Sequence, residues 1–338
     1  MLNLKDNEVI DLGTSYEGYD FENNLLINSG LFNPIPETST SVAFDTLMNT
    51  TPGALDALAR YGAAWNNVKR DKFSTHYLPI PTFPVVGSVT AQSFQSRRAF
   101  GTEAEDLLST AIANEQFRQA QAVNETKEKS FGSSLFHNQV IGENAIVLVD
   151  LAAEFGFTQQ TATVDLSSST VNPVSAMSDI VGDAREQIAG SLKAVTGFMV
   201  VCSPSFFKAL KNSTFVLNMA QYSLVDRDVA FPSNLPAYRR FSVDGVTYVE
   251  DLSLASHGIA DGDAYMFPTF SQKNEANPYR YVYGPCSRNI AYAASLAPQQ
   301  IFQWAVARMA SVEVYAEAGI LALNTRPDFV TKITNTAA

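Results

Sequence analysis

The sequence predicts an α+β protein with two lobes, an extended arm and an extended ribbon. Three observations lead to this prediction. Residues 1–50 are rich in polar and turn-forming residues, and Pro34 and Pro36 exclude a helix around them. A long helix is predicted from Thr102. After residue 174 helices and strands alternate, and the chain closes in long alternating segments.

Length, composition and charge limit the classes of protein to consider. With 338 residues, 46% hydrophobic and 17% charged, the chain can bury a sizeable core. Its net charge of -11 argues against a protein that grips nucleic acid, but not against one that surrounds it. The N-terminus has no basic leader before an apolar run, and no segment approaches the ~18 apolar residues of a membrane span. We therefore expect no signal peptide and no membrane partner.

The arm has no core of its own, so we expect it to become buried only against neighbouring copies. Its apolar side chains are Leu26, Ile27, Leu31 and Phe32. A short helix is predicted over 51–67, with Thr51 as N-cap and Pro52 at the first helical position. The following segment, near 72–100, is Pro-spaced, and its part VVGSVTAQSFQ alternates like a two-stranded ribbon.

The long helix begins with a capping box formed by Thr102 and Glu105 and runs to about residue 130. Its apolar stripe thins along its length, and its second half is polar on most faces. This pattern predicts a spine that lies across a surface, with its more apolar end at the N-terminus.

The segment after residue 174 predicts a compact α/β unit. Asn172-Pro173 opens a helix, GFMVVC follows as a buried strand, and Ser203-Pro204 opens a second helix. Asp244-Gly245 is the predicted turn of a hairpin. The last segment alternates over a long distance and ends in a strand after Arg326-Pro327. The spine helix and the last strands flank this unit, which makes the chain two discontinuous lobes.

Two carboxylates in ENAIVLVDLAAEFGFTQQTATVDL, Asp150 and Glu154, are spaced i and i+4. If buried together they would share a proton, as in an acid pair of a catalytic pocket. The alternative, which we favour, is that they face solvent on a short helix that Gly156 terminates.

The histidines do not form a predicted catalytic constellation. His76 lies in the Pro-spaced segment, and His137 and His257 lie in contexts unlike it and unlike each other. A metal site of His257, Asp261 and Asp263 is an alternative to the surface turn that DGD usually forms, and we favour the turn.

The cysteines and glycines suggest no nucleophile and no phosphate loop. Cys202 lies in an apolar run and is predicted to be a small buried hydrophobe, and we expect no disulfide with Cys286. No G-x-S-x-G, Walker or Rossmann pattern occurs. The sequence therefore predicts no catalytic, cofactor-binding or metal-binding residues.

Short basic pairs are interpreted as partners for carboxylates of a neighbouring subunit, with solvated faces as the alternative. The candidate inter-subunit contacts are Lys69, Arg70, Arg97, Arg98, Glu103, Arg239 and Arg240.

Three segments resemble the major capsid proteins of lambda-like tailed bacteriophages. AIVLVDLAAEFGFTQ resembles the segment that follows their spine helix. VSAMSDIVGDAREQIAGSLKAVTGFMVVCSPSFFKALKNS resembles the start of their axial domain, and VEVYAEAGILALNTRPDFVTKITN their last strands with an N-x-R-P turn. The resemblance covers about 103–338, and the order of the segments fits the family. The resemblance implies that the segment around Asp150 is a structural junction between the spine helix and the axial domain.

The resemblance implies the tailed-phage capsid fold, named for the Hong Kong phage. Residues 1–50 would be the N-terminal arm, and 51–100 the short helix and extended loop. The peripheral domain with the spine helix would comprise 101–173 and 298–338, and the axial domain 174–297. YSLVDRDVAFPSNLPAY would lie near the capsomer centre.

The implied function is a viral major capsid protein without catalytic residues or cofactor. It would self-assemble as hexamers and pentamers into an icosahedral shell in the host cytoplasm and enclose double-stranded DNA, contacted non-specifically. Because no long charged helical leader precedes the arm, we expect a separate scaffolding protein, besides a portal and a decoration protein. The alternatives are an encapsulin-like shell enclosing enzyme cargo and a soluble α/β enzyme.

Overall fold

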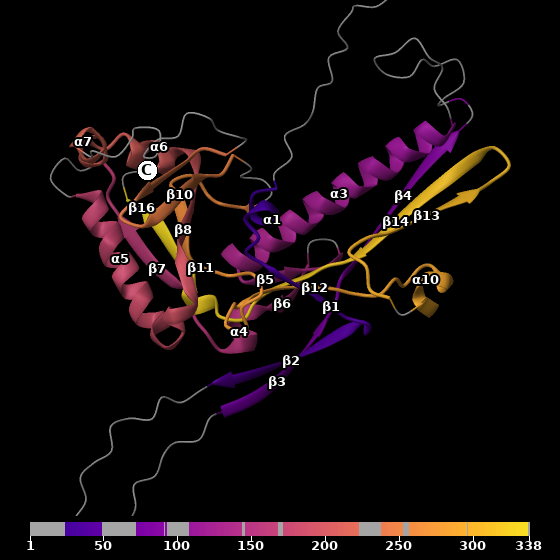
Figure 1. Cartoon of the computed structure of the whole chain (residues 1–338), viewed down its shortest axis with the longest axis horizontal. Helices are drawn as coiled ribbons and strands as arrows, with labels where there is room; N and C mark the ends of the chain where they lie inside the picture. Colours follow the sequence, from indigo (N-terminus) through magenta and orange to yellow (C-terminus); the bar gives the residue numbers. More distant parts are fainter. Residues whose placement is uncertain are drawn as a thin grey trace, which may run out of the picture.

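The computed structural model describes residues 24–48, 72–90, 92, 108–143, 146–167, 172–222, 238–252, 257–295 and 297–336. A compact lobe and an elongated lobe meet at the long helix α3 (Leu108–Phe136), and a hairpin projects from the body (Figure 1). No helix among the described residues is long and apolar enough to span a membrane.

The compact lobe is built on a mixed six-stranded sheet in the order β7-β16-β11-β8-β10-β9. The strands are β7 (Gln160–Val164), β8 (Val195–Cys202), β9 (Arg240–Val243), β10 (Val246–Glu250), β11 (Asp263–Phe270) and β16 (Thr331–Asn335). The helices beside it are α5 (Pro173–Ile188), η3 (Ala189–Ala194), α6 (Pro204–Lys211) and α7 (Thr214–Tyr222).

The sheet is buried on both faces at its central strands β8 and β11, where successive side chains point to opposite faces. Val200 and Cys202 of β8 pack with α5 and α6, where Met177 and Phe206 are buried. Val201 joins the opposite core, which α3 reaches. The near-continuous apolar run of β8 is what a strand covered on both faces requires.

Local signals of the compact lobe are confirmed. The Asn172 side chain accepts from Val174 N at 3.0 Å, with Pro173 in the first turn of α5. Asp244 and Gly245, with φ of 52° and 74°, form the predicted turn between β9 and β10.

Strands from both expected domains share this sheet. β7 and β16 come from the segments assigned to the peripheral domain, yet β16 pairs with β11 of the expected axial domain. The sheet therefore crosses the expected boundaries at residues 173 and 298, which sequence patterns cannot reveal because β7 and β16 lie far apart in the chain.

The elongated lobe consists of α3 and a three-stranded antiparallel sheet in the order β13-β14-β4. Its strands are β4 (Thr82–Thr90), β13 (Phe302–Ala307) and β14 (Ser311–Gly319). β4 pairs along its whole length with β14, from Thr82 opposite Gly319 to Thr90 opposite Ser311. The prediction that this segment pairs with itself is therefore wrong for the described residues: alternation predicts a strand but not its partner.

The burial of α3 is the reverse of the prediction. Its C-terminal end, Phe131–Phe136, is buried, whereas Phe117 is 62% exposed. Small residues allow close approach there, since a Cβ on Gly132 would lie 2.7 Å from the ring of His257. The helix ends at Phe136 rather than near residue 130. The predicted capping box of Thr102 and Glu105 lies outside the described residues.

The described part of the arm packs on its own chain. It contains α1 (Leu25–Ser29) and β1 (Asn33–Pro36), and Leu26 and Phe32 are buried in the core with Phe131. The prediction that the arm needs neighbouring copies for burial is thus wrong for residues 24–36. The residues that pack against the arm, such as Phe131, lie about a hundred or more positions later in the sequence. Local sequence patterns therefore do not show this contact.

A second three-stranded sheet, β1-β12-β15, holds the arm against the body. Its other strands are β12 (Tyr279–Tyr283) and β15 (Leu321–Asn324). β1 runs parallel to β12 at the edge of the sheet, where Pro34 and Pro36 are tolerated because a proline lacks the N–H that an interior strand would need.

A two-stranded hairpin of β2 (Ser41–Met48) and β3 (Lys72–Pro79) projects from the body (Figure 1). At its base Val42 and Leu78 are buried in a core with Leu151. The expected boundary at residue 50 falls between its two strands, and the expected helix over 51–67 lies outside the described residues. Among the described residues, the remaining elements are β5 (Gln139–Ile141), β6 (Val147–Asp150), α4 (Leu151–Phe155), α10 (Ile290–Ser295) and η4 (Pro327–Phe329).

Candidate functional site

Asp150 and Glu154 lie in a segment that connects the hairpin to the body. Asp150 caps α4, since its carboxylate accepts from Ala152 N at 3.0 Å, and Gly156 ends the helix with φ of 72°. Both acids are exposed, which confirms the favoured interpretation. Glu154 Oε1 lies 2.9 Å from Nδ1 of His76 on β3, so the segment fastens the hairpin.

The N-x-R-P turn forms a second joint. Arg326 Nε and Nη2 donate to the two oxygens of Asp328 at 2.9 and 2.7 Å. Its guanidinium lies over the ring of Phe157, 4.6 Å from the centroid, and Phe157 belongs to the EFGFTQ motif. Gln187 of α5 donates to Asp328 at 3.2 Å. All three segments that carry the resemblance therefore meet at this corner.

Arg326→Lys is expected to destabilise the free chain by about 1–2 kcal/mol, because lysine cannot provide the planar fork or stack equally well. The midpoint of urea unfolding measures this. Arg308→Lys is the control, since Arg308 makes an exposed ion pair with Glu313. Equal midpoints for the two variants would contradict the role of this corner.

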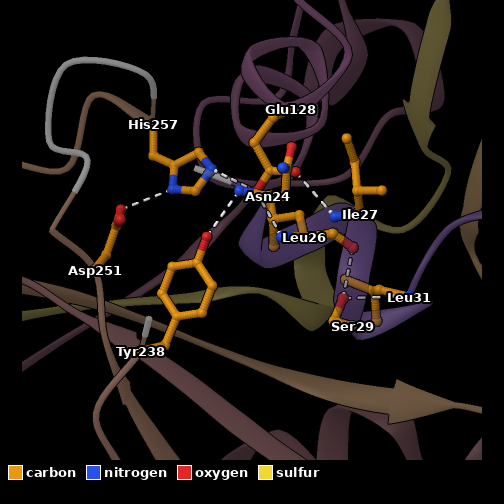
Figure 2. A network of polar contacts seen from close by, with 9 residues as sticks. All are labelled: Asn24, Leu26, Ile27, Ser29, Leu31, Glu128, Tyr238, Asp251 and His257. Carbon is orange, nitrogen blue, oxygen red and sulfur yellow. Dashed lines mark hydrogen bonds and ion pairs between the residues drawn. The ribbon is translucent and has the colours of Figure 1, made fainter. Parts of the chain in front are cut away.

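A buried acid–histidine–acid network lies between the two lobes (Figure 2). His257 Nδ1 is 2.7 Å from Asp251 Oδ2, and its Nε2 is 3.1 Å from Glu128 Oε1. Burial alone would favour a neutral ring, but the hydrogen bonds with Asp251 and Glu128 prevail and raise the pKa of His257 to about 9. The ring is therefore charged at neutral pH.

The same Glu128 carboxylate holds the arm. Leu26 N donates to Oε1 at 2.5 Å and Ile27 N to Oε2 at 2.9 Å, so the first turn of α1 points at a negative charge (Figure 2). Asn24 N donates to the hydroxyl of Tyr238 at 2.7 Å. The network thus connects the arm, α3 and the segments on either side of the β9–β10 hairpin.

The favoured turn at DGD is confirmed, since Asp261 and Gly262 form a turn with Asp261 exposed, whereas the side chain of His257 is buried. It does not join Asp261 and Asp263, since Asp261 accepts from the Ser205 hydroxyl and Asp263 binds Lys332 at 2.7 Å. No group of three or more His, Cys, Asp or Glu among the described residues is suited to a metal ion. No local signal marks His257, because Glu128 lies 129 positions away.

Glu317 of β14 is a second buried carboxylate. Its Oε1 accepts from Ser287 N at 2.9 Å and from the Ser287 hydroxyl at 2.5 Å, and its Oε2 accepts from Arg288 N at 3.0 Å. Burial opposes its charge, but these donors and the thiol of Cys286 bring the pKa of Glu317 below its ordinary value. It ties the loop after β12 to the elongated lobe.

Both cysteines are free thiols, as predicted, and both are buried, which the sequence predicted for Cys202 alone. Cys202 is fully buried, and burial raises the pKa of its thiol well above the ordinary value. Such a thiol is unreactive and serves as a small hydrophobic residue of β8.

Only two of the candidate inter-subunit contacts lie among the described residues. Arg239 Nε is 3.6 Å from Glu250 Oε2 of the same chain, and Arg240 is exposed at the start of the edge strand β9. Their contact with another subunit stays a prediction. The other candidates lie outside the described residues: Lys69, Arg70, Arg97, Arg98 and Glu103.

The projecting parts carry exposed apolar side chains. Phe117 of α3 and Val86 of β4 are 62% and 63% exposed on the elongated lobe, and Met309 at the β13–β14 turn is fully exposed. On the hairpin, Tyr77 is 75% exposed. These elements therefore offer apolar side chains for contact with other chains.

Comparison with known proteins decides the family. The sequence model described as "Phage major capsid protein E" matches residues 17–335. The chain belongs to this family. It is therefore a shell-forming capsid protein of the tailed-phage type, and the joints and exposed surfaces described above are those of a capsid subunit.

Solved capsid structures share the fold of this capsid protein. The capsid of Ralstonia phage GP4 matches with a TM-score of 0.58 at 9% identity, covering 99% of this chain and 98% of that one. The capsid of the cyanophage P-SCSP1u gives 0.58 at 10% identity, with 98% and 94% covered. The capsid of a native GTA particle gives 0.57 at 12% identity, with 99% and 98% covered. These likenesses confirm the predicted tailed-phage capsid fold. No curated protein compared with the chain matches it.

Family membership supports a phage shell over the encapsulin-like shell, and a structural protein over the soluble α/β enzyme. The sequence segments that carried the resemblance were thus sufficient to identify the family. The joints at His76, His257 and Glu317 were not visible in them.

Proposed function

We propose that this capsid protein assembles as hexamers and pentamers into an icosahedral shell around double-stranded DNA. One observation carries the proposal: the hairpin and the elongated lobe extend from the body and expose Tyr77 and Phe117. An isolated two-stranded hairpin is marginal in water, so packing against neighbouring subunits would stabilise it.

The charge of the chain supports a non-specific relation to the packaged DNA. A net charge of -11 leaves few cations free to neutralise phosphates, so the DNA would be enclosed rather than gripped. The further proposed partners are a separate scaffolding protein, a portal and a decoration protein. Assembly would take place in the host cytoplasm, and the mature shell would be part of the virion.

The double variant Val86→Ser/Phe117→Ser is expected to lose most shell formation while its chain stays folded. Both side chains are exposed in the subunit, so polar replacements remove apolar surface that assembly would bury. The variant and the wild type are each expressed with the neighbouring structural genes, and shells are quantified by sedimentation and negative-stain microscopy.

Asn114→Ser is the matched control, because Asn114 is an exposed polar residue of the same helix. We expect Asn114→Ser to form shells at the wild-type yield. For the contents of the shell, we expect nuclease-resistant DNA in particles from phage-producing cells. Wild-type shell yields from the double variant would contradict the proposed surface, and particles filled with protein cargo would contradict the proposed contents.

A further inference from the structure

The network around His257 does more than join two lobes. We propose that Glu128, His257 and Asp251 form a proton-dependent latch, which holds the N-terminal arm on the spine helix and releases it when His257 loses its proton. This inference goes beyond shell formation, because it concerns a conformational change within one chain.

The geometry fits a protonated ring. Both ring nitrogens of His257 face carboxylate oxygens, at 2.7 Å from Asp251 and 3.1 Å from Glu128. A neutral imidazole has a single N–H and offers a lone pair at its other nitrogen, so one carboxylate would face a lone pair. The imidazolium donates to both, and it supplies the positive charge that two buried carboxylates need.

The latch reaches the arm through one shared oxygen. Glu128 Oε1 accepts from both His257 Nε2 and Leu26 N, while Oε2 accepts from Ile27 N. When the ring is neutral, the two buried carboxylates Glu128 and Asp251 lose the positive charge that lies between them. Glu128 is relieved by turning toward water, and this change weakens its contacts with the arm amides.

The short helix α1 depends on this anchor. α1 has five residues, far fewer than the about 12–15 that an isolated helix needs for marginal stability. Its remaining support is the hydrogen bond from Asn24 N to the Tyr238 hydroxyl and apolar packing, such as that of Leu26 in the core beside Phe131. Loss of the polar anchor should therefore open α1 before the rest of the core.

The other titratable groups facing the network do not replace the proton. Lys127, next to Glu128 on α3, attracts that carboxylate, but its ammonium lies 4.4 Å from the centroid of the Tyr281 ring and donates to Gln300 at 3.1 Å rather than to Glu128. Tyr238 accepts from Asn24 N, and burial raises its pKa, so it stays neutral. His137 Nε2 lies 2.9 Å from the backbone oxygen of His257 rather than from the carboxylates.

The direction of the pH effect follows from the sign of the shift. Because the pKa of His257 is raised from 6.5 to about 9, the docked arm gains its full stabilisation below pH 6.5 and loses it as the pH rises through about 9. The latch is therefore closed at neutral pH and opens under alkaline conditions.

Hydrogen exchange of the unassembled full-length chain from pH 7 to 10 tests the latch. After correction for the intrinsic base-catalysed rate, protection of the peptide containing Leu26 and Ile27 should fall by at least about tenfold, or ~1.4 kcal/mol. Peptides from α5 should keep their protection. Because the chain is not assembled, the result does not depend on shell formation.

Asp251→Asn is the decisive variant. The side-chain amide that it introduces can donate to Nδ1 of a neutral ring whose Nε2–H donates to Glu128, so the arm should stay docked and its protection should no longer depend on pH. His76→Gln, which removes a histidine–carboxylate pair on the hairpin, should keep the wild-type profile.

Three outcomes would overturn the latch. The first is a flat wild-type profile, which needs no variant to interpret. The second is a profile of Asp251→Asn that still falls between pH 7 and 10, since the titrating group would then be another. The third is equal loss of protection in α1 and α5, which would indicate global unfolding.

Discussion

Glu317→Ala is expected to lower the free energy of unfolding of the free chain by about 3–5 kcal/mol. The carboxylate is fully buried and accepts from the backbone N–H groups of Ser287 and Arg288 and from the Ser287 hydroxyl. Alanine would leave these donors unpaired, at a cost of about 1–3 kcal/mol each before the loop relaxes. The shift of the urea midpoint measures the effect.

The control lies on the same strand. Glu313 of β14 makes its ion pair with Arg308 at the surface, so Glu313→Ala should leave the midpoint nearly unchanged. A change of similar size in both variants would refute the buried anchor.

Glu317 also makes the stability of the folded chain depend on pH in the acidic range. Its pKa is below its ordinary value of 4.5 in the folded chain, so the stability it contributes is present above pH 4.5 and is lost as the pH falls through the lower folded value.

Phe131→Ala is expected to cost about 3–5 kcal/mol, as for other large buried aromatic residues. The ring stacks on Phe32 of the arm with centroids 4.1 Å apart and meets Tyr281 edge-on at 5.4 Å. Its loss would leave a cavity at the point where arm, spine helix and β12 meet. The unfolding midpoint of the unassembled chain and exchange in α1 both report it.

Phe117 provides the matched comparison, since it is the same residue type on the same helix but exposed. Phe117→Ala should leave the unassembled chain at nearly wild-type stability. If both variants shifted the midpoint equally, the division of α3 into a buried and an exposed end would be wrong.

The parts of the fold that were predictable depend on residues adjacent in the chain. The Asn172 cap, the Asp244-Gly245 turn and the strand after Arg326-Pro327 each rest on a few neighbouring residues whose backbone preferences suffice. The helical end of the Asp150 segment at Gly156 is of the same kind.

The parts that were not predictable depend on partners far along the chain. The backbone N–H of Leu26 donates to Glu128, which lies 102 positions later in the sequence, and β4 pairs with β14. The burial of α3 follows what packs on it rather than its own composition: the end with Gly132 and Phe131 admits the arm and His257. A polar residue such as Glu128 is consequently buried where the pattern indicated a solvated face.

A cryo-electron microscopy map of the assembled shell tests the account most directly. It should show closed shells in which Leu26 and Ile27 of each subunit lie on Glu128 of the same subunit, while Tyr77 and Phe117 are covered by neighbours. Residues 24–36 seated on another subunit's spine helix, or Phe117 facing solvent in every subunit, would contradict it.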